Sequence, residues 1–152
     1  MTYEQAILHV PSGFHFLVRS AYDMLNLLKS ADVANENAEI NNVYELSGSL
    51  IVMADNINNP IHKVLWGRVV YSIRGQSMKT CRLCGIKGRR RRYFKQRYAL
   101  CFKHFLEEVD KFEREFYKDY VTSPEKTSKI NKFRHFKEVS NELEELKKLT
   151  SE

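Results

Sequence analysis

Residues 81–104 read CRLCGIKGRRRRYFKQRYALCFKH, a stretch that contains two pairs of potential metal ligands separated by sixteen residues. The four ligands are Cys81, Cys84, Cys101 and His104. The first pair converges on one ion if the backbone turns tightly, and Gly85 supplies the dihedral freedom that such a turn needs. A helix that begins near Leu100 would place the second pair on one face of its first turn. We therefore expect the stretch to fold around one metal ion.

Three thiolates and one imidazole are a ligand set typical of zinc, and four protein ligands complete a tetrahedral shell. Such a shell leaves no position for a reactive water, so we expect one structural Zn²⁺ and no catalytic metal. Two other interpretations stay open. One is a redox Cys-x-x-Cys, although no βαβ pattern surrounds it. The other is a pair of buried cysteines with a third that is near by coincidence.

The spacer between the two ligand pairs is strongly basic and includes aromatic residues. Guanidinium groups match phosphate oxygens and stack on bases, and aromatic rings stack on unpaired bases. This pattern favours a surface for DNA or RNA. The predicted nucleic-acid-binding residues are Lys79, Arg82, Lys87, Arg89, Arg90, Arg91, Arg92, Tyr93, Lys95, Arg97 and Lys103. A solvated charged face and an import signal are the plainer alternatives for the arginine run.

Charge is unevenly distributed along the 152 residues, whose formal net charge is +6. Residues 1–55 hold seven acids and two bases, whereas residues 56–106 hold thirteen bases and no acid. Residues 107–152 hold twelve acids and ten bases. A segment of fifty-one residues without one carboxylate repels itself unless a polyanion or the rest of the fold offsets its charge.

Apolar residues recur at helical spacing through most of the remaining chain. The predicted helices cover 14–28, 40–57, 61–73, 105–121 and 130–149. Ser12 is the expected N-cap of the first helix, and Asn59 and Pro60 are expected to start the third. Val64, Leu65, Val69 and Ile73 are expected to face inward, and residues 75–77 to end that helix. The fold class is therefore mainly α: an acidic N-terminal helical bundle over 1–75, a basic zinc-stapled hairpin and helix module over 78–121, and a charged C-terminal helix over 122–152.

This part of the sequence resembles the treble-clef class of zinc fingers. It contains the knuckle CRLCG, then a basic stretch, then a helix that opens at YALCFKHFLEE. The segment is also similar to the zinc-binding part of certain small ribosomal proteins. The resemblance covers about residues 81–121 and implies a knuckle, a β-hairpin and a helix that carries the last two ligands. This sequence differs in its histidine as fourth ligand and in its longer spacer. Because many unrelated functions share the motif, it implies a local fold.

Several classes of protein are disfavoured by the sequence. An odd number of cysteines excludes a complete disulfide framework, and no stretch approaches the ~20 apolar residues that span a bilayer. The N-terminus lacks the pattern of a secretory or organelle signal. We therefore expect an intracellular, soluble protein, cytoplasmic or nuclear, with no membrane and no small-molecule substrate as partner.

The leading functional hypothesis is a non-enzymatic zinc-stabilised nucleic-acid-binding protein, a regulator of transcription or of an RNA-associated assembly. An alternative is an adaptor that binds a polymerase or ribosome through protein surfaces. A zinc-finger nuclease is a further alternative. It is disfavoured because residues 85–100 contain no His, Asp, Glu or Asn to serve as a general base or bind a catalytic metal.

Overall fold

The computed structural model describes residues 1–90 and 98–122. The chain divides into two compact units, one formed by Met1–Arg91 with Gln96–Phe105 and the other by Arg92–Lys95 with Leu106–Glu152. The predicted helix over 130–149, and with it nearly all of the C-terminal segment over 122–152, lies outside the described residues.

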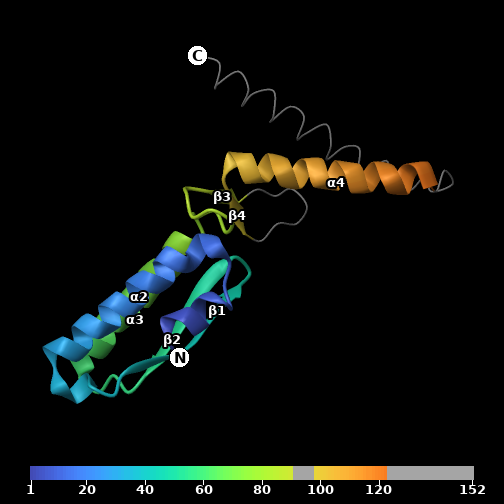
Figure 1. Ribbon diagram of the computed structural model, residues 1–152. Helices are drawn as coiled ribbons and strands as arrows, with labels where there is room; N and C mark the ends of the chain where they lie inside the picture. The colour runs from blue at the N-terminus through green and yellow to red at the C-terminus, as the bar shows by residue number, and fades with distance from the viewer. Residues whose placement is uncertain (91–97, 123–152) are drawn as a thin grey trace, which may run out of the picture. The chain divides into compact units, whose positions relative to one another are not determined.

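Helices account for most of the described secondary structure, and the predicted mainly α fold class is confirmed (Figure 1). Two 3₁₀ turns, Ser12–Phe14 and Val33–Asn35, flank the second helix. The α-helices are α1 (Tyr3–Ile7), α2 (His15–Ala31), α3 (Pro60–Ser77) and α4 (Phe102–Thr122). None of the helices within the described ranges combines the length and apolar character of a membrane-spanning segment.

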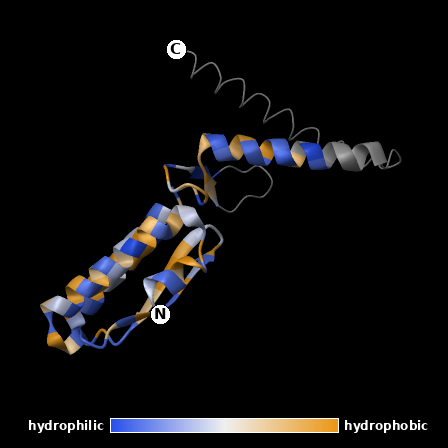
Figure 2. Ribbon diagram, in the orientation of Figure 1, coloured by the Kyte–Doolittle hydropathy of each residue, from blue (hydrophilic) through white to orange (hydrophobic). Residues whose placement is uncertain are grey.

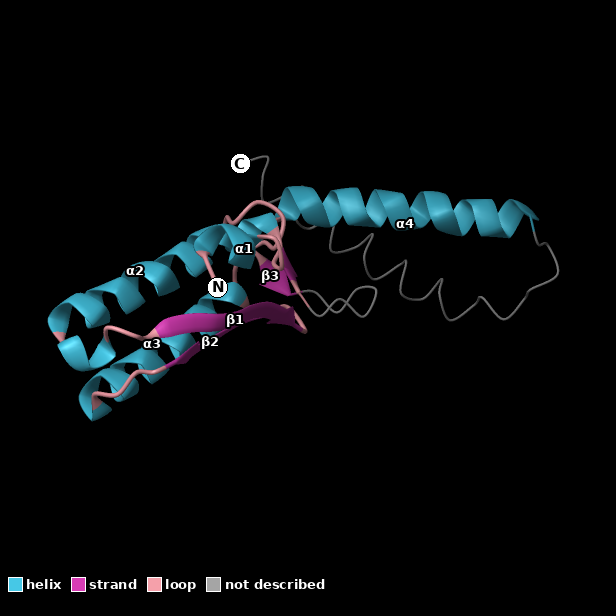
Figure 3. Ribbon diagram, turned by 60° about the horizontal axis from the view of Figure 1, so that its bottom comes forward, coloured by secondary structure: helices cyan, strands magenta, loops and turns pink. Residues whose placement is uncertain are grey.

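The segment predicted as a helix over 40–57 is instead an antiparallel β-hairpin, so this prediction was wrong (Figure 3). Strand β1 covers Glu39–Leu46 and β2 covers Ser49–Asp55, with Leu46 paired to Ser49. Ser47 and Gly48 form the turn, and both have positive φ, at 51° and 76°. Positive φ at both central residues is the type I′ geometry that matches the twist of a two-residue hairpin.

Helix α3 begins as predicted, because Oδ1 of Asn59 accepts hydrogen bonds from the backbone N–H groups of Ile61 and His62. It continues through the residues expected to break it at 75–77 and ends at Ser77. The buried Ser77 hydroxyl accepts a 2.8 Å hydrogen bond from the backbone N–H of Leu50 and donates to the Arg74 carbonyl. The last turn of α3 is therefore held by the hairpin.

The start of α2 differs from the prediction that Ser12 caps it. Residues 12–14 form a 3₁₀ turn, and Phe14 occupies the N-cap position without a side-chain hydrogen bond. The Ser12 hydroxyl instead donates to the carbonyl of Leu83, 2.8 Å away and 71 residues later in the chain. This serine is thus used for a tertiary contact rather than a local one.

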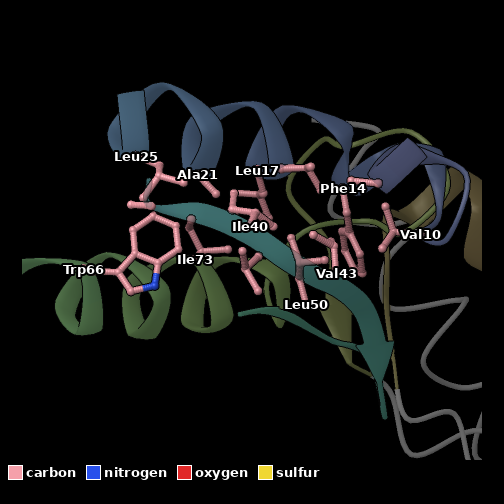
Figure 4. Close-up of a cluster of buried hydrophobic side chains, with 14 of the residues drawn as sticks. Val10, Phe14, Leu17, Ala21, Leu25, Ile40, Val43, Leu50, Trp66 and Ile73 are labelled. Carbon is pink, nitrogen blue, oxygen red and sulfur yellow. The ribbon is translucent and has the colours of Figure 1, made fainter. Parts of the chain in front are cut away.

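One hydrophobic core lies between α2, α3 and the hairpin (Figure 4). Helix α2 contributes the predicted series that includes Leu17, Ala21 and Leu25, and Ile40, Val43 and Leu50 of the hairpin meet it. Hydrophobic residues alternate with hydrophilic ones along α2 and α3, as expected of helices packed on one side (Figure 2).

The predicted inward face of helix α3 is confirmed in part, because Ile73 is buried in this core and Val69 packs against it. Trp66 is 7% exposed and Ile73 is 4% exposed, so they provide the inward contacts. Val64 and Leu65, predicted to face inward, are 59% and 41% exposed. Apolar residues occur on both sides of α3, and their spacing alone does not distinguish the buried side from the exposed one.

At the other end of α2, the fully buried side chain of Asn35 organises the connection to α3. Its Oδ1 accepts from the backbone N–H groups of Asn58 and Asn59, at 3.0 and 3.2 Å. Its Nδ2 donates to the Leu28 carbonyl and lies 2.6 Å from Nδ1 of His62. The polar segment over 31–38 is therefore a connection whose hydrogen bonds hold the start of α3 in place.

Candidate metal centre

The first ligand pair lies on a tight knuckle that begins just after α3. The backbone N–H of Cys81 donates to the Ile86 carbonyl at 2.8 Å, and that of Gly85 donates to the Cys81 carbonyl at 2.9 Å. Gly85 has a φ of 79°, in the left-handed region that favours glycine. Thr80 and Lys87 form an antiparallel bridge that closes the knuckle. Gly85 therefore allows the tight turn after Cys84, as predicted.

The second ligand pair follows a short two-stranded sheet. Strand β3 (Arg89–Arg90) pairs with β4 (Ala99–Leu100), and Cys101 comes directly after β4. The Cys101 carbonyl accepts the backbone N–H of Phe105 at 2.9 Å, so the cysteine lies at the entrance to α4. His104 is therefore in the first turn of α4, close to the predicted helix start near Leu100.

These elements bring together all four predicted ligands, whose donor atoms lie within 4.8 Å of one another. Sγ of Cys84 is 3.8 Å from Sγ of Cys101, and Nδ1 of His104 is 3.3 Å from Sγ of both Cys81 and Cys101. Around a tetrahedral ion with zinc-like bond lengths, two sulfurs lie about 3.8 Å apart, and a sulfur and a nitrogen about 3.5 Å apart. These three separations are close to those values, and the quartet could hold a single metal ion.

The surroundings of Cys81 favour the thiolate form that a metal requires. Burial by itself raises the pKa of the Cys81 thiol, but hydrogen bonds from the backbone N–H groups of Cys101, Cys84 and Leu83, with a contact from His104, lower it to about 6. The N–H group of Cys101 stands at the start of α4, where the helix dipole is positive. The pKa of the Cys84 thiol is instead raised, because a hydrogen bond from the Ile86 backbone, which lowers it, is outweighed by desolvation and the neighbouring Cys81 and Cys101 thiols. Cys81 and Cys101 are buried and Cys84 is exposed, so the centre lies at the edge of its unit.

The knuckle packs directly against the backbone that leads into α2. The N–H of Gly13 donates to the Arg82 carbonyl at 2.9 Å, next to the hydrogen bond from Ser12 to Leu83. A Cβ atom at Gly13 would lie 2.1 Å from the Cys81 carbonyl oxygen and 2.6 Å from the Arg82 carbonyl carbon. Only a residue without a side chain allows this approach, so Gly13 helps to position the metal centre.

Arg82 and Arg90, both predicted to bind nucleic acid, each form hydrogen bonds to the β1–β2 hairpin. Nη2 of Arg82 forms a 2.8 Å ion pair with Glu45. Nη2 of Arg90 donates to the Ser47 carbonyl at 3.0 Å and lies 3.4 Å from the Ser49 hydroxyl. The guanidinium of Arg82 also stacks over the ring of Tyr98, 4.3 Å from its centroid. These two residues tie the knuckle and β3 to the hairpin.

The other predicted basic residues divide into two groups. Lys79, Lys87, Arg89 and Lys103 are exposed, and none of them has a carboxylate partner among the described residues. The remaining predicted residues, Arg91, Arg92, Tyr93, Lys95 and Arg97, lie outside the described part of the chain. The exposed cations flank both ligand pairs in the sequence, and Lys87 pairs with Thr80 in the bridge that closes the knuckle.

Sequence reasoning missed the residues that receive the knuckle, namely Ser12, Gly13, Glu45, Ser47 and Ser49. No local pattern marks them, because each acts through a partner at least 37 residues away.

In comparisons with protein-family models, curated proteins and solved structures, the chain matches none of them.

Proposed function

We propose that this chain is a non-enzymatic, zinc-stabilised nucleic-acid-binding protein in which the metal centre holds a basic surface in a fixed shape. One observation carries the proposal. Four exposed cations without described carboxylate partners, Lys79, Lys87, Arg89 and Lys103, lie on the segments that carry a cluster of three cysteines and one histidine. The proposal also takes support from the resemblance to treble-clef fingers, in which a knuckle, a hairpin and a helix follow one another as the knuckle, the β3–β4 pair and α4 do here.

Zinc is the metal that this donor set suits best. Soft thiolates select zinc, copper(I) or iron–sulfur clusters, and a mixed sulfur and nitrogen tetrahedron favours zinc among these. Because the four protein ligands complete the shell, the metal's role is to fix the knuckle relative to the first turn of α4.

Nucleic acid suits the surface because cations in a region without acids form an extended site for a polyanion. Their spread over the knuckle, β3 and α4 also suits successive phosphates better than one small anion. Arg82 and Arg90 already contact the hairpin, so the contacts to phosphate are assigned to the other four cations. Transcription regulation or an RNA-associated assembly is the setting in which such a protein would act.

The first experiment measures the metal content of the purified protein and of its Cys101→Ala variant. We expect one zinc per chain in the parent and its loss in the variant. A parent protein that contains no zinc after growth with zinc supplementation would contradict the metal assignment.

The second experiment measures binding of the zinc-loaded protein to short DNA and RNA duplexes and single strands over a salt series. Each lost phosphate contact reduces the slope of log K against log salt by about 0.7 to 0.9. A Lys87→Gln, Arg89→Gln double variant should therefore bind more weakly and with a shallower slope. The matched control is Lys29→Gln in the last turn of α2, at the end away from the knuckle. An unchanged slope in the double variant, or no binding to any of these probes, would overturn the proposed function.

A further inference from the structure

Helix α3 carries apolar side chains on the side that faces away from the core. Ile61 is 71% exposed, Val64 is 59%, Leu65 is 41% and Tyr71 is 79%. We call these four residues the α3 face. The first three are at spacings of i, i+3 and i+4, and Tyr71 follows two turns after Val64, so they share one side of the helix. Exposed apolar groups are ordinary one by one, whereas a contiguous row marks a binding surface.

The backbone beside Tyr71 is open on both sides. Gly67 and Gly75 lie four residues before and four residues after it, in one row along the helix surface. A Cβ atom placed on either glycine meets nothing within 4 Å. Glycine costs about 1 kcal/mol relative to alanine inside a helix. Packing within the described chain therefore does not require either glycine. They leave room on each side of the tyrosine for the backbone or side chains of another helix.

The charges around the α3 face have one sign. Arg68 and Arg74, three residues before and after Tyr71, are exposed, as is Lys63. None of the three forms an ion pair with a described residue, and residues 56–106 contain no acid. Two copies of α3 that met through this face would bring these cations together, and the like charges would oppose the contact. A partner that carries carboxylates would be attracted instead.

We propose that the α3 face is a docking site for an acidic amphipathic helix of a partner protein. The apolar residues of that helix would pack along the α3 face and beside Tyr71, and its Asp and Glu residues would meet Lys63, Arg68 and Arg74. A helix that lies along a hydrophobic helix surface is a common mode of peptide recognition, and tyrosine and arginine are the residues most often found at the centre of such contacts. This surface is separate from the cations around the metal centre.

The test uses the full zinc-loaded chain and two fluorescent synthetic helices of twenty residues. Both carry leucine at helical spacing, one with glutamate and the other with lysine at every remaining position. Fluorescence anisotropy should show saturable binding of the glutamate peptide and no binding of the lysine peptide. Tyr71→Ala and Arg68→Glu should each weaken binding of the glutamate peptide at least tenfold. The matched control is Leu27→Ser, which alters an apolar residue of α2 that is 63% exposed.

Three results would overturn the proposal: no binding of the glutamate peptide, equal binding of both peptides, or equal loss of binding in Leu27→Ser and Tyr71→Ala. Sedimentation of the chain alone should show no self-association that Tyr71→Ala abolishes, since that result would assign the face to a second copy. In the nucleic-acid assay, Tyr71→Ala should keep the affinity and salt slope of the parent. A loss there would assign the face to nucleic acid, so this inference and the proposed function fail on different measurements.

Discussion

The guanidinium of Arg82 and the carboxylate of Glu45 lie 2.8 Å apart and join the metal-binding knuckle to the end of β1. Their side chains are 30% and 15% exposed, so water screens this pair less than a pair at the open surface. The stacking of Arg82 on Tyr98 holds the guanidinium in place. The pair therefore connects three segments of the chain.

Replacement of Glu45 by Gln should lower the free energy of unfolding by about 1–3 kcal/mol, because it leaves a partly buried guanidinium without its counter-charge. Urea denaturation of the zinc-loaded protein measures the change. The control is Asp110→Asn, which breaks the exposed i,i+4 pair with Arg114 and should cost less than about 0.5 kcal/mol. Equal costs for the two variants would show that the Arg82–Glu45 pair is an ordinary surface pair.

Gly13→Ala should destabilise the protein by about 1–3 kcal/mol and weaken zinc binding, because the new methyl group would overlap the backbone of Cys81 and Arg82. Zinc affinity is measured by competition with a chromophoric chelator. Gly67→Ala is the matched control, since its methyl group meets nothing within 4 Å and should stabilise α3 by about 0.5–1 kcal/mol. A Gly13→Ala protein with unchanged zinc affinity would contradict the contact.

Asn35→Leu should cost about 2–4 kcal/mol, because it leaves the backbone N–H groups of Asn58 and Asn59 and the Leu28 carbonyl without their buried partner. Thermal unfolding gives the magnitude. Asn26→Leu, at an exposed position of α2, tests whether the loss of an amide alone is responsible. The two variants should differ clearly in melting temperature, and similar values would refute the role of Asn35.

A fall in pH should lower the stability of the metal-free protein and its affinity for zinc, in both cases because the Cys81 thiolate is protonated. Its pKa is about 6 in the folded protein and 9.0 in the reference state. A lowered pKa means that the thiolate stabilises the fold fully above pH 9, and that this contribution is lost as the pH falls through 6. Urea midpoints of the metal-free protein should therefore fall between pH 8 and pH 5.5, and Cys81→Ser should reduce this difference. Zinc affinity should decrease in the same direction, since protons compete for the thiolates.

The sequence predicts which four side chains come together as candidate ligands, because their spacing is local. Two short spacings, a glycine after the knuckle and a helix after the second pair restrict the arrangements that remain. The cap of α3 is predictable for the same reason, since Asn59 bonds to groups two and three residues ahead. The uses of Ser12, Arg82 and Arg90 are not, because their partners are distant in the chain.

The hairpin over 39–55 resembles a helix in sequence for an identifiable reason. A β-bulge falls between Ile40 and Asn42, so Ile40 and Val43 are both buried although they are three residues apart. A regular strand would bury every second residue. The bulge gives β1 a spacing of three, and Val43 and Leu50, on either side of the turn, are seven residues apart, which equals about two helical turns. The β-branched and aromatic content of these strands is the remaining signal for a hairpin.

The contact of Ser12 with Leu83 spans 71 residues, and that of Glu45 with Arg82 spans 37. Both contacts join the segment that carries Cys81 and Cys84 to the N-terminal third of the chain, and neither uses a metal ligand side chain. Removal of the ion would therefore free the second ligand pair first, and a metal-free chain would be expected to keep its knuckle against α2 and the hairpin.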